Sequence, residues 1–125
     1  MRNFGENTKV LWHDRKRYFG LPLSFTRYDL VEKEDSWLKI FCSTGLLSTS
    51  EEEVNVYRIF DLSIYQSFFD KIFNVGTITL HCNDETHEEI YLVNIKNPYK
   101  VRDRIAQLIE TERAKKGYRL GEFYS

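Results

Sequence analysis

The chain has 125 residues, a length that suits one domain, and it combines 42% hydrophobic with 30% charged residues. Its 18 Lys and Arg nearly balance its 19 Asp and Glu, which excludes a protein-wide positive field for nucleic acid or anionic lipid. No stretch holds the roughly 18 uninterrupted apolar residues of a membrane-spanning helix, and the N-terminus lacks the apolar segment of a secretory signal, so we expect a cytoplasmic protein without a transmembrane segment.

The N-terminal part of the chain shows no strand or helix pattern. Residues 1–11 are mostly polar, so we expect a flexible tail there and a single domain over residues 12–117. The basic triplet Arg15–Arg17 follows, and Gly20 and Pro22 interrupt the chain before a regular strand can start. Regular structure is therefore expected from Ser24 onward.

Six later segments have the two-residue alternation and the β-branched or aromatic content of strands. They cover residues 24–31, 37–43, 46–57, 62–67, 77–82 and 89–95. The first two should form a hairpin around the charged turn 32–36, and the acidic run Glu51–Glu53 is expected to be solvated. Cys42 and Cys82 lie on apolar faces of these strands, so we interpret both as reduced core residues.

Two segments have helical spacing instead. In residues 68–75, four large hydrophobic residues pack at intervals of one, three and four, which indicates a helical turn that ends at Gly76. Asn97 and Pro98 are a favourable helix start, an apolar stripe follows, and Gly117 should close the helix. Several antiparallel strands followed by one terminal helix favour a partly open barrel with the helix at one end.

Several residue strings, taken in their order along the chain, carry a family resemblance. They are Trp12, Arg15-Lys16-Arg17, Gly20-Leu21-Pro22, Phe25-Thr26-Arg27-Tyr28, Thr44-Gly45-Leu46-Leu47, Glu53-Val54-Asn55-Val56-Tyr57-Arg58-Ile59-x-Asp61-Leu62, Val75-Gly76-Thr77-Ile78 and Asn94-Ile95-Lys96-Asn97-Pro98. Over roughly residues 12–116 the chain resembles the small members of the bacterial pleckstrin-homology-like (PH-like) family. The resemblance implies a mainly β fold, a partly open antiparallel barrel of about seven strands capped by one C-terminal helix. It also implies a binding or assembly module, with no catalytic residues to carry over.

Basic residues near the first hairpin are one candidate site, by analogy with the bases that hold inositol phosphates in eukaryotic PH domains. They are Arg15, Lys16, Arg17, Arg27, Lys33 and Lys39. The hairpin turn also carries Glu32, Glu34 and Asp35, which would repel a polyphosphate, and each base contributes only about 1 kcal/mol at an anionic surface. Weak peripheral binding to anionic lipid headgroups is therefore the alternative function. The other interpretation of these bases is that they are solvated surface residues that bind no ligand.

A groove between the terminal helix and a sheet edge is the second candidate, because PH-like folds resemble phosphotyrosine-binding domains in offering one. It would lie between residues 77–82 and the helix 98–112, with Thr79, His81, Arg102 and Gln107 as polar contacts to an extended peptide. A second copy of the chain, or solvent alone, could cover the same edge. The leading expectation is thus a non-catalytic module for protein or peptide interaction or self-association, with an unknown partner.

Catalytic and metal sites are not expected. His81, Cys82, Asp84 and His87 could ligate zinc by residue type, but adjacent strand residues point to opposite faces, so we predict no metal site. The serines lack a nucleophile elbow, and no phosphate-binding glycine loop or dinucleotide fingerprint occurs. We therefore expect no enzyme, no cofactor and no nucleic-acid partner, and a C-terminal tail over residues 118–125.

Overall fold

The computed structural model describes residues 8–21, 24–33, 37–45, 50–83 and 88–124. Its strands are Lys9–Arg15 (β1), Arg27–Glu32 (β2), Leu38–Thr44 (β3), Ser50–Asn55 (β4), Ile59–Tyr65 (β5), Val75–Cys82 (β6) and Glu89–Lys96 (β7). A 3₁₀ turn, Val56–Arg58 (η1), a short helix, Phe68–Phe73 (α1), and a long helix, Pro98–Tyr124 (α2), complete the chain. The mainly β fold with one C-terminal helix is confirmed.

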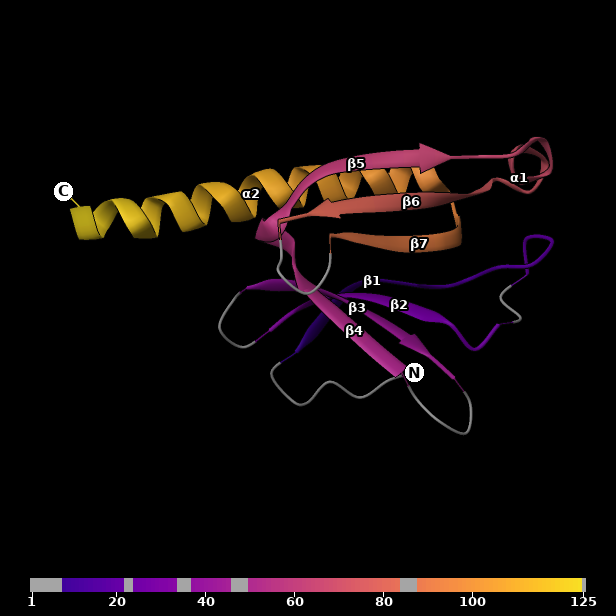
Figure 1. The fold of residues 1–125 in the computed structure, drawn as a ribbon, viewed down its shortest axis with the longest axis horizontal. Coiled ribbons are helices and arrows are strands. Elements are labelled where there is room, and N and C mark those ends of the chain that lie inside the picture. Colours follow the sequence, from indigo (N-terminus) through magenta and orange to yellow (C-terminus); the bar gives the residue numbers. More distant parts are fainter. Residues whose placement is uncertain (1–7, 22–23, 34–36, 46–49, 84–87, 125) are drawn as a thin grey trace.

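The strands form two antiparallel sheets that face each other and do not close into one barrel (Figure 1). Strand order is β1-β2-β3-β4 in the first sheet and β5-β6-β7 in the second. Alternate residues from both sheets, together with Ile105 and Ile109 of α2, make one core. Leu30, Ile40 and Leu80 in this core are fully buried, so the two-residue alternation of the strands identifies the core face correctly.

The N-terminal segment is a strand, contrary to the expectation of a tail up to residue 11 and irregular structure after it. β1 pairs with β2 over its whole length, from Lys9 opposite Glu32 to Arg15 opposite Arg27. A shift in register between Val10 and Trp12 breaks the alternation. This break, in a strand that also carries polar residues, explains why no periodic pattern is visible in the sequence.

The long helix continues beyond Gly117, where we expected it to end, and reaches Tyr124. A Cβ on Gly117 would meet nothing within 4 Å, so this glycine is an exposed helical position that is tolerated at about 1 kcal/mol. The buried carboxylate of Glu112 accepts a hydrogen bond from the backbone N–H of Leu38 (3.1 Å) and forms an ion pair with Lys115 (2.9 Å), which fixes α2 to the start of β3. No helix in the described part of the chain is long and apolar enough to cross a membrane.

Gly76 does not end the helical turn. Asn74, in the left-handed conformation with φ 53°, caps α1, while Gly76 lies in β6. A Cβ on Gly76 would come within 2.9 Å of Gln66 Cγ, 3.0 Å of Pro98 Cγ and 3.1 Å of the Tyr65 carbonyl oxygen. The glycine is required because β5 and the start of α2 approach the β6 backbone closely, and not because of a turn.

The segment between the two sheets is also divided differently from the prediction. β4 includes the acidic run, with Glu52 and Glu53 exposed within the strand, and η1 interrupts the chain before β5 starts at Ile59. Residues 46–49, which we expected to begin this strand, lie outside the described residues. The solvated character of Glu52 and Glu53 is confirmed.

Candidate functional site

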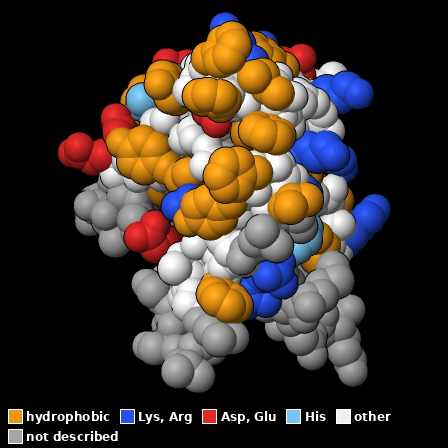
Figure 2. All heavy atoms as spheres, turned by 90° about the vertical axis from the view of Figure 1, so that its right-hand side faces the viewer, with side chains coloured by type: hydrophobic (Ala, Val, Ile, Leu, Met, Phe, Trp, Pro, Cys, Tyr) orange, Lys and Arg blue, Asp and Glu red, His pale blue; other side chains and the backbone are white. Residues whose placement is uncertain are grey.

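Large hydrophobic side chains are exposed where the β1–β2 connection meets α1. These are Tyr18, Phe19 and Leu21 of the connection and Phe68, Phe69, Ile72 and Phe73 of α1, and together we call them the aromatic surface. Their exposed fractions range from 39% for Phe73 to 80% for Phe19. Figure 2 shows hydrophobic side chains gathered on this end of the molecule, which is the right-hand end of Figure 1. A contiguous exposed patch of this kind usually marks a surface that binds a protein or a membrane.

The short helix α1 is held by its caps. Ser67 Oγ accepts a hydrogen bond from the Asp70 N–H (3.2 Å), and the Asp70 carboxylate accepts one from the Ser67 N–H (3.0 Å), which is a capping box. No residue of α1 is buried. The predicted helical turn is confirmed, but its hydrophobic side chains face solvent instead of packing inward.

The β1–β2 connection places Phe19 at the tip of a tight turn. Tyr18 and Leu21 exchange two backbone hydrogen bonds (3.0 and 2.9 Å), and Phe19 and Gly20 between them have φ of 53° and 81°. Two central residues with positive φ are typical of a type I′ turn, which favours Asn-Gly. A bulky side chain in the left-handed conformation costs about 1 kcal/mol, so Phe19 is strained where it is most exposed.

The turn and α1 contact each other and form one surface. The rings of Phe19 and Phe73 lie edge to face with centroids 6.2 Å apart. A Cβ on Gly20 would sit 3.4 Å from Phe73 Cδ1, so the small residue lets the turn approach the helix. The seven exposed side chains therefore come from two segments about 50 residues apart in the sequence.

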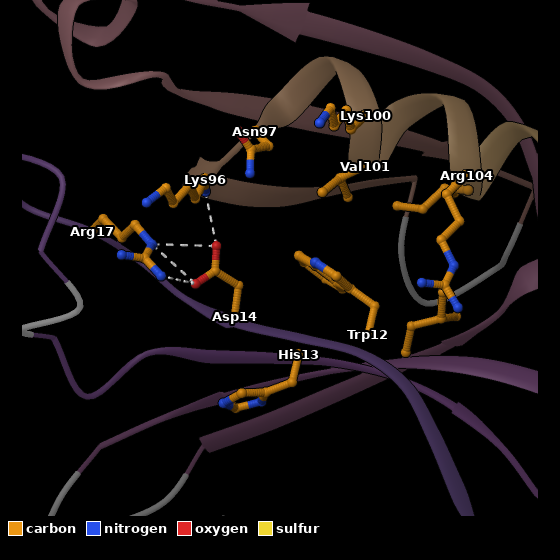
Figure 3. A pocket seen from close by; sticks show the side chains of 11 residues that line it. Trp12, His13, Asp14, Arg17, Lys96, Asn97, Lys100, Val101 and Arg104 are labelled. Carbon is orange, nitrogen blue, oxygen red and sulfur yellow. Dashed lines mark hydrogen bonds and ion pairs between the residues drawn. The ribbon is translucent and has the colours of Figure 1, made fainter.

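The buried carboxylate of Asp14 fixes the connection to the second sheet (Figure 3). It accepts hydrogen bonds from the Lys96 N–H (2.8 Å) and from Arg17 Nε (3.1 Å). Arg17 in turn donates to the Gly20 carbonyl (2.9 Å) and, through its backbone N–H, to the Asn94 carbonyl (2.9 Å). Sequence reasoning missed Asp14; a single acid within the basic segment 13–17 is the only signal that could have indicated it.

The six bases predicted to bind lipid divide between two ends of the first sheet. Arg15, Lys16, Arg17 and Arg27 lie at or next to the aromatic surface, whereas Lys33 and Lys39 lie at the opposite end of β2 and β3. Lys16 stands over the ring of Tyr18 (5.4 Å from its centroid) and Arg17 is paired with Asp14 (3.0 Å). The structure therefore does not bring the six together, and their role in lipid binding stays a prediction.

The four residues of the predicted peptide groove are also separated. Thr79 and His81 lie on β6, whereas Arg102 and Gln107 lie on α2. β6 pairs with both β5 and β7, so it has no free edge, and the prediction of an edge there is wrong. Because Ile78 and Leu80 of β6 enter the core, alternation turns Thr79 and His81 to the outer face, where His81 Nε2 lies 2.9 Å from Ser63 Oγ. The edge strand that approaches α2 is β5, and binding of a peptide by the four residues stays a prediction.

Burial shifts two titratable groups of the first sheet. It raises the pKa of Tyr28 to about 12, and the Tyr28 hydroxyl accepts a hydrogen bond from the Val93 N–H (2.9 Å) that links the two sheets. Burial also raises the pKa of the Cys42 thiol to about 12. Cys82 is buried in the core and Cys42 is half-buried against it, which agrees with the predicted apolar faces of their strands.

The residues considered for zinc do not form a cluster in the structure. His81 lies on the outer face and Cys82 is buried in the core, while Asp84 and His87 lie outside the described residues. Within the described ranges, no group of three or more His, Cys, Asp or Glu could hold a metal ion.

Comparison with known proteins agrees with the order of elements. A family model described as the bacterial PH domain matches residues 22–109, from within the β1–β2 connection into the middle of α2. No curated protein and no solved structure was found to match the chain. Seven strands in two facing antiparallel sheets, followed by one C-terminal helix, are consistent with this match. Because the match covers most of its length, the chain belongs to the bacterial PH domain family.

Proposed function

We propose that this protein is a non-catalytic interaction module that binds a protein partner through the aromatic surface. A second copy of the same chain is the partner that can be tested with the purified protein alone. Family membership supports a binding module, and the aromatic surface is the observation that carries the proposal. Phe and Tyr are enriched at protein interfaces, and burial of one Phe side chain contributes about 2 kcal/mol.

The way these side chains are held supports a built interface. The caps of α1 and the Asp14 network fix the backbone without using the aromatic rings, which leaves the rings available for a partner. Phe19 adopts a strained conformation at 80% exposure, and such strain is typical of functional positions. Binding to a pre-organised surface loses little conformational entropy.

Weak binding to anionic lipid headgroups is the second candidate, favoured by the four bases at or next to the aromatic surface, Arg15, Lys16, Arg17 and Arg27. Aromatic side chains beside bases are also common where proteins lie on membranes. However, Arg17 is already paired with Asp14. Figure 2 shows acidic side chains along one side of this face and Lys and Arg along the other. Such a mixed rim favours a protein partner over a uniformly negative surface.

Light scattering of the full chain over a wide concentration range tests the proposal. We expect an oligomer for the wild type and a monomer for the double variant Phe68→Ser/Phe69→Ser, because both side chains are about 70% exposed and do not contribute to the core. The matched control is Phe60→Ser/Tyr91→Ser, which removes two exposed aromatic side chains outside the aromatic surface and should leave the oligomer intact.

Sedimentation with phosphatidylglycerol vesicles distinguishes the lipid candidate. Binding below physiological ionic strength that disappears above it would support the basic residues, because salt screens exposed charges. A monomer at every concentration that also fails to sediment with vesicles would overturn both self-association and lipid binding.

A further inference from the structure

A pocket of about 310 Å³ lies between β1 and the first turns of α2 (Figure 3). None of the seven residues of the aromatic surface lines it. Its volume is at the small end of the range for ligand pockets, which suits a small molecule and not an extended peptide.

One part of the pocket lining is apolar, and the rest is polar or charged. The apolar part includes the fully buried Leu30 and Ile105, which is 1% exposed. Trp12 of β1 and Val101 of α2 are half-buried against the core and point into the space between the two elements (Figure 3). This lining offers contact to a flat hydrocarbon group.

The rim of the pocket is cationic. The exposed side chains of Lys96, Lys100 and Arg104 line it, and none of these three side chains makes a hydrogen bond or ion pair with another described residue. Lys100 and Arg104 both belong to the first turns of α2, and the Arg104 side chain extends from the helix toward β1 (Figure 3). The carboxylate of Asp14, which also lines the pocket, is already neutralised by Arg17 and the Lys96 N–H. These bases would attract an anion placed at the rim.

We propose that this pocket binds a small organic acid, with the apolar part of the ligand between Trp12 and Val101 and its carboxylate at the cationic rim, where Arg104 extends toward β1. The positive end of the α2 dipole, at Pro98, adds to the attraction for the carboxylate. An inorganic anion would leave the apolar side chains of the pocket in contact with water. Recognition therefore requires the apolar part of the ligand as well as its carboxylate. The ligand would not contact the aromatic surface, although Asp14 and Arg17, which fix the β1–β2 connection, also line this pocket.

Titration of the full chain with 2-naphthoate, followed by NMR, tests the site. We expect the indole N–H of Trp12 to shift and that of Trp37, which contacts Tyr57 and Lys115 away from the pocket, to stay unchanged. Neutral 2-naphthamide should bind at least about tenfold more weakly, since it cannot pair with the bases. Inorganic phosphate at the same concentration should not displace 2-naphthoate.

Two exposed arginines of α2 provide a matched pair of variants. Arg104→Gln should weaken 2-naphthoate about fivefold, the loss expected for one exposed charge pair, whereas Arg113→Gln, which is outside the pocket, should bind as the wild type does. Both side chains are exposed, so neither variant endangers the fold. Equal affinity for naphthoate and naphthamide, equal effects of the two variants, displacement by phosphate, or a shift of Trp37 together with Trp12 would overturn the proposal.

Discussion

Substitution of Phe19 should weaken binding through the aromatic surface while leaving the free energy of unfolding almost unchanged. Phe19 is 80% exposed, so about one fifth of its side chain is buried, worth about 0.5 kcal/mol, and its edge contact with Phe73 adds about 0.5 kcal/mol. Phe19→Asn loses both but relieves about 1 kcal/mol of left-handed strain. We therefore expect the free energy of unfolding to change by less than about 0.5 kcal/mol, while binding through the aromatic surface weakens.

Phe19→Ala is the matched comparison, because alanine loses the same contacts and keeps the left-handed strain. It should be about 1 kcal/mol less stable than Phe19→Asn. Urea unfolding, followed by the fluorescence of Trp12 and Trp37, measures the difference as a shift in the midpoint at constant slope. Equal stability of the two variants would refute the argument from turn strain. A loss of more than about 2 kcal/mol in both would show that Phe19 is a packing residue.

Three further predictions concern the fold. Gly76→Ala should cost about 2 kcal/mol in urea unfolding, because its Cβ would meet the Tyr65 carbonyl oxygen at 3.1 Å; a neutral result would contradict the close approach of β5 and β6. Glu112→Ala should cost about 2 kcal/mol, because the Leu38 N–H is left unpaired, and Glu112→Gln should recover part of this loss; equal losses would argue against the hydrogen bond. Burial favours the neutral forms of Tyr28 and Cys42, so their contribution to stability is complete below pH 9 and is lost as pH rises toward about 12. Unfolding midpoints across this range should fall less steeply in Cys42→Ala than in the wild type, and identical slopes would contradict the raised thiol pKa.

Most of the fold could be predicted from the sequence because its strands alternate regularly. Residues 77–82 and 89–95 are such cases, and each is a strand in the structure. β1 could not be predicted, because a shift in register after Val10 breaks its alternation and Asp14 is buried for its hydrogen bonds. The role of Gly76 depends on Pro98, which is distant in the sequence, so local pattern could only indicate a turn.

The candidate site was harder to predict than the fold. The helical spacing of Phe68, Phe69, Ile72 and Phe73 is the same whether the helix faces a core or solvent, so it predicts the turn and not its exposure. The positions of the basic residues depend on strand register, which places Lys33 and Lys39 at the end of β2 and β3 away from the aromatic surface. Pairing information of this kind is long-range and is not contained in any single segment.

The hydrogen bonds of Asp14 also have a consequence for the order of folding. Its bond to the Lys96 N–H joins residues 82 positions apart, so the β1–β2 turn cannot be fixed to the second sheet before β7 is in place. During synthesis, Arg17 and Phe19 leave the ribosome long before their respective partners Asn94 and Phe73. The aromatic surface is therefore assembled at the end of folding, and a nascent or truncated chain that lacks β7 would present these hydrophobic residues without the geometry that a partner recognises.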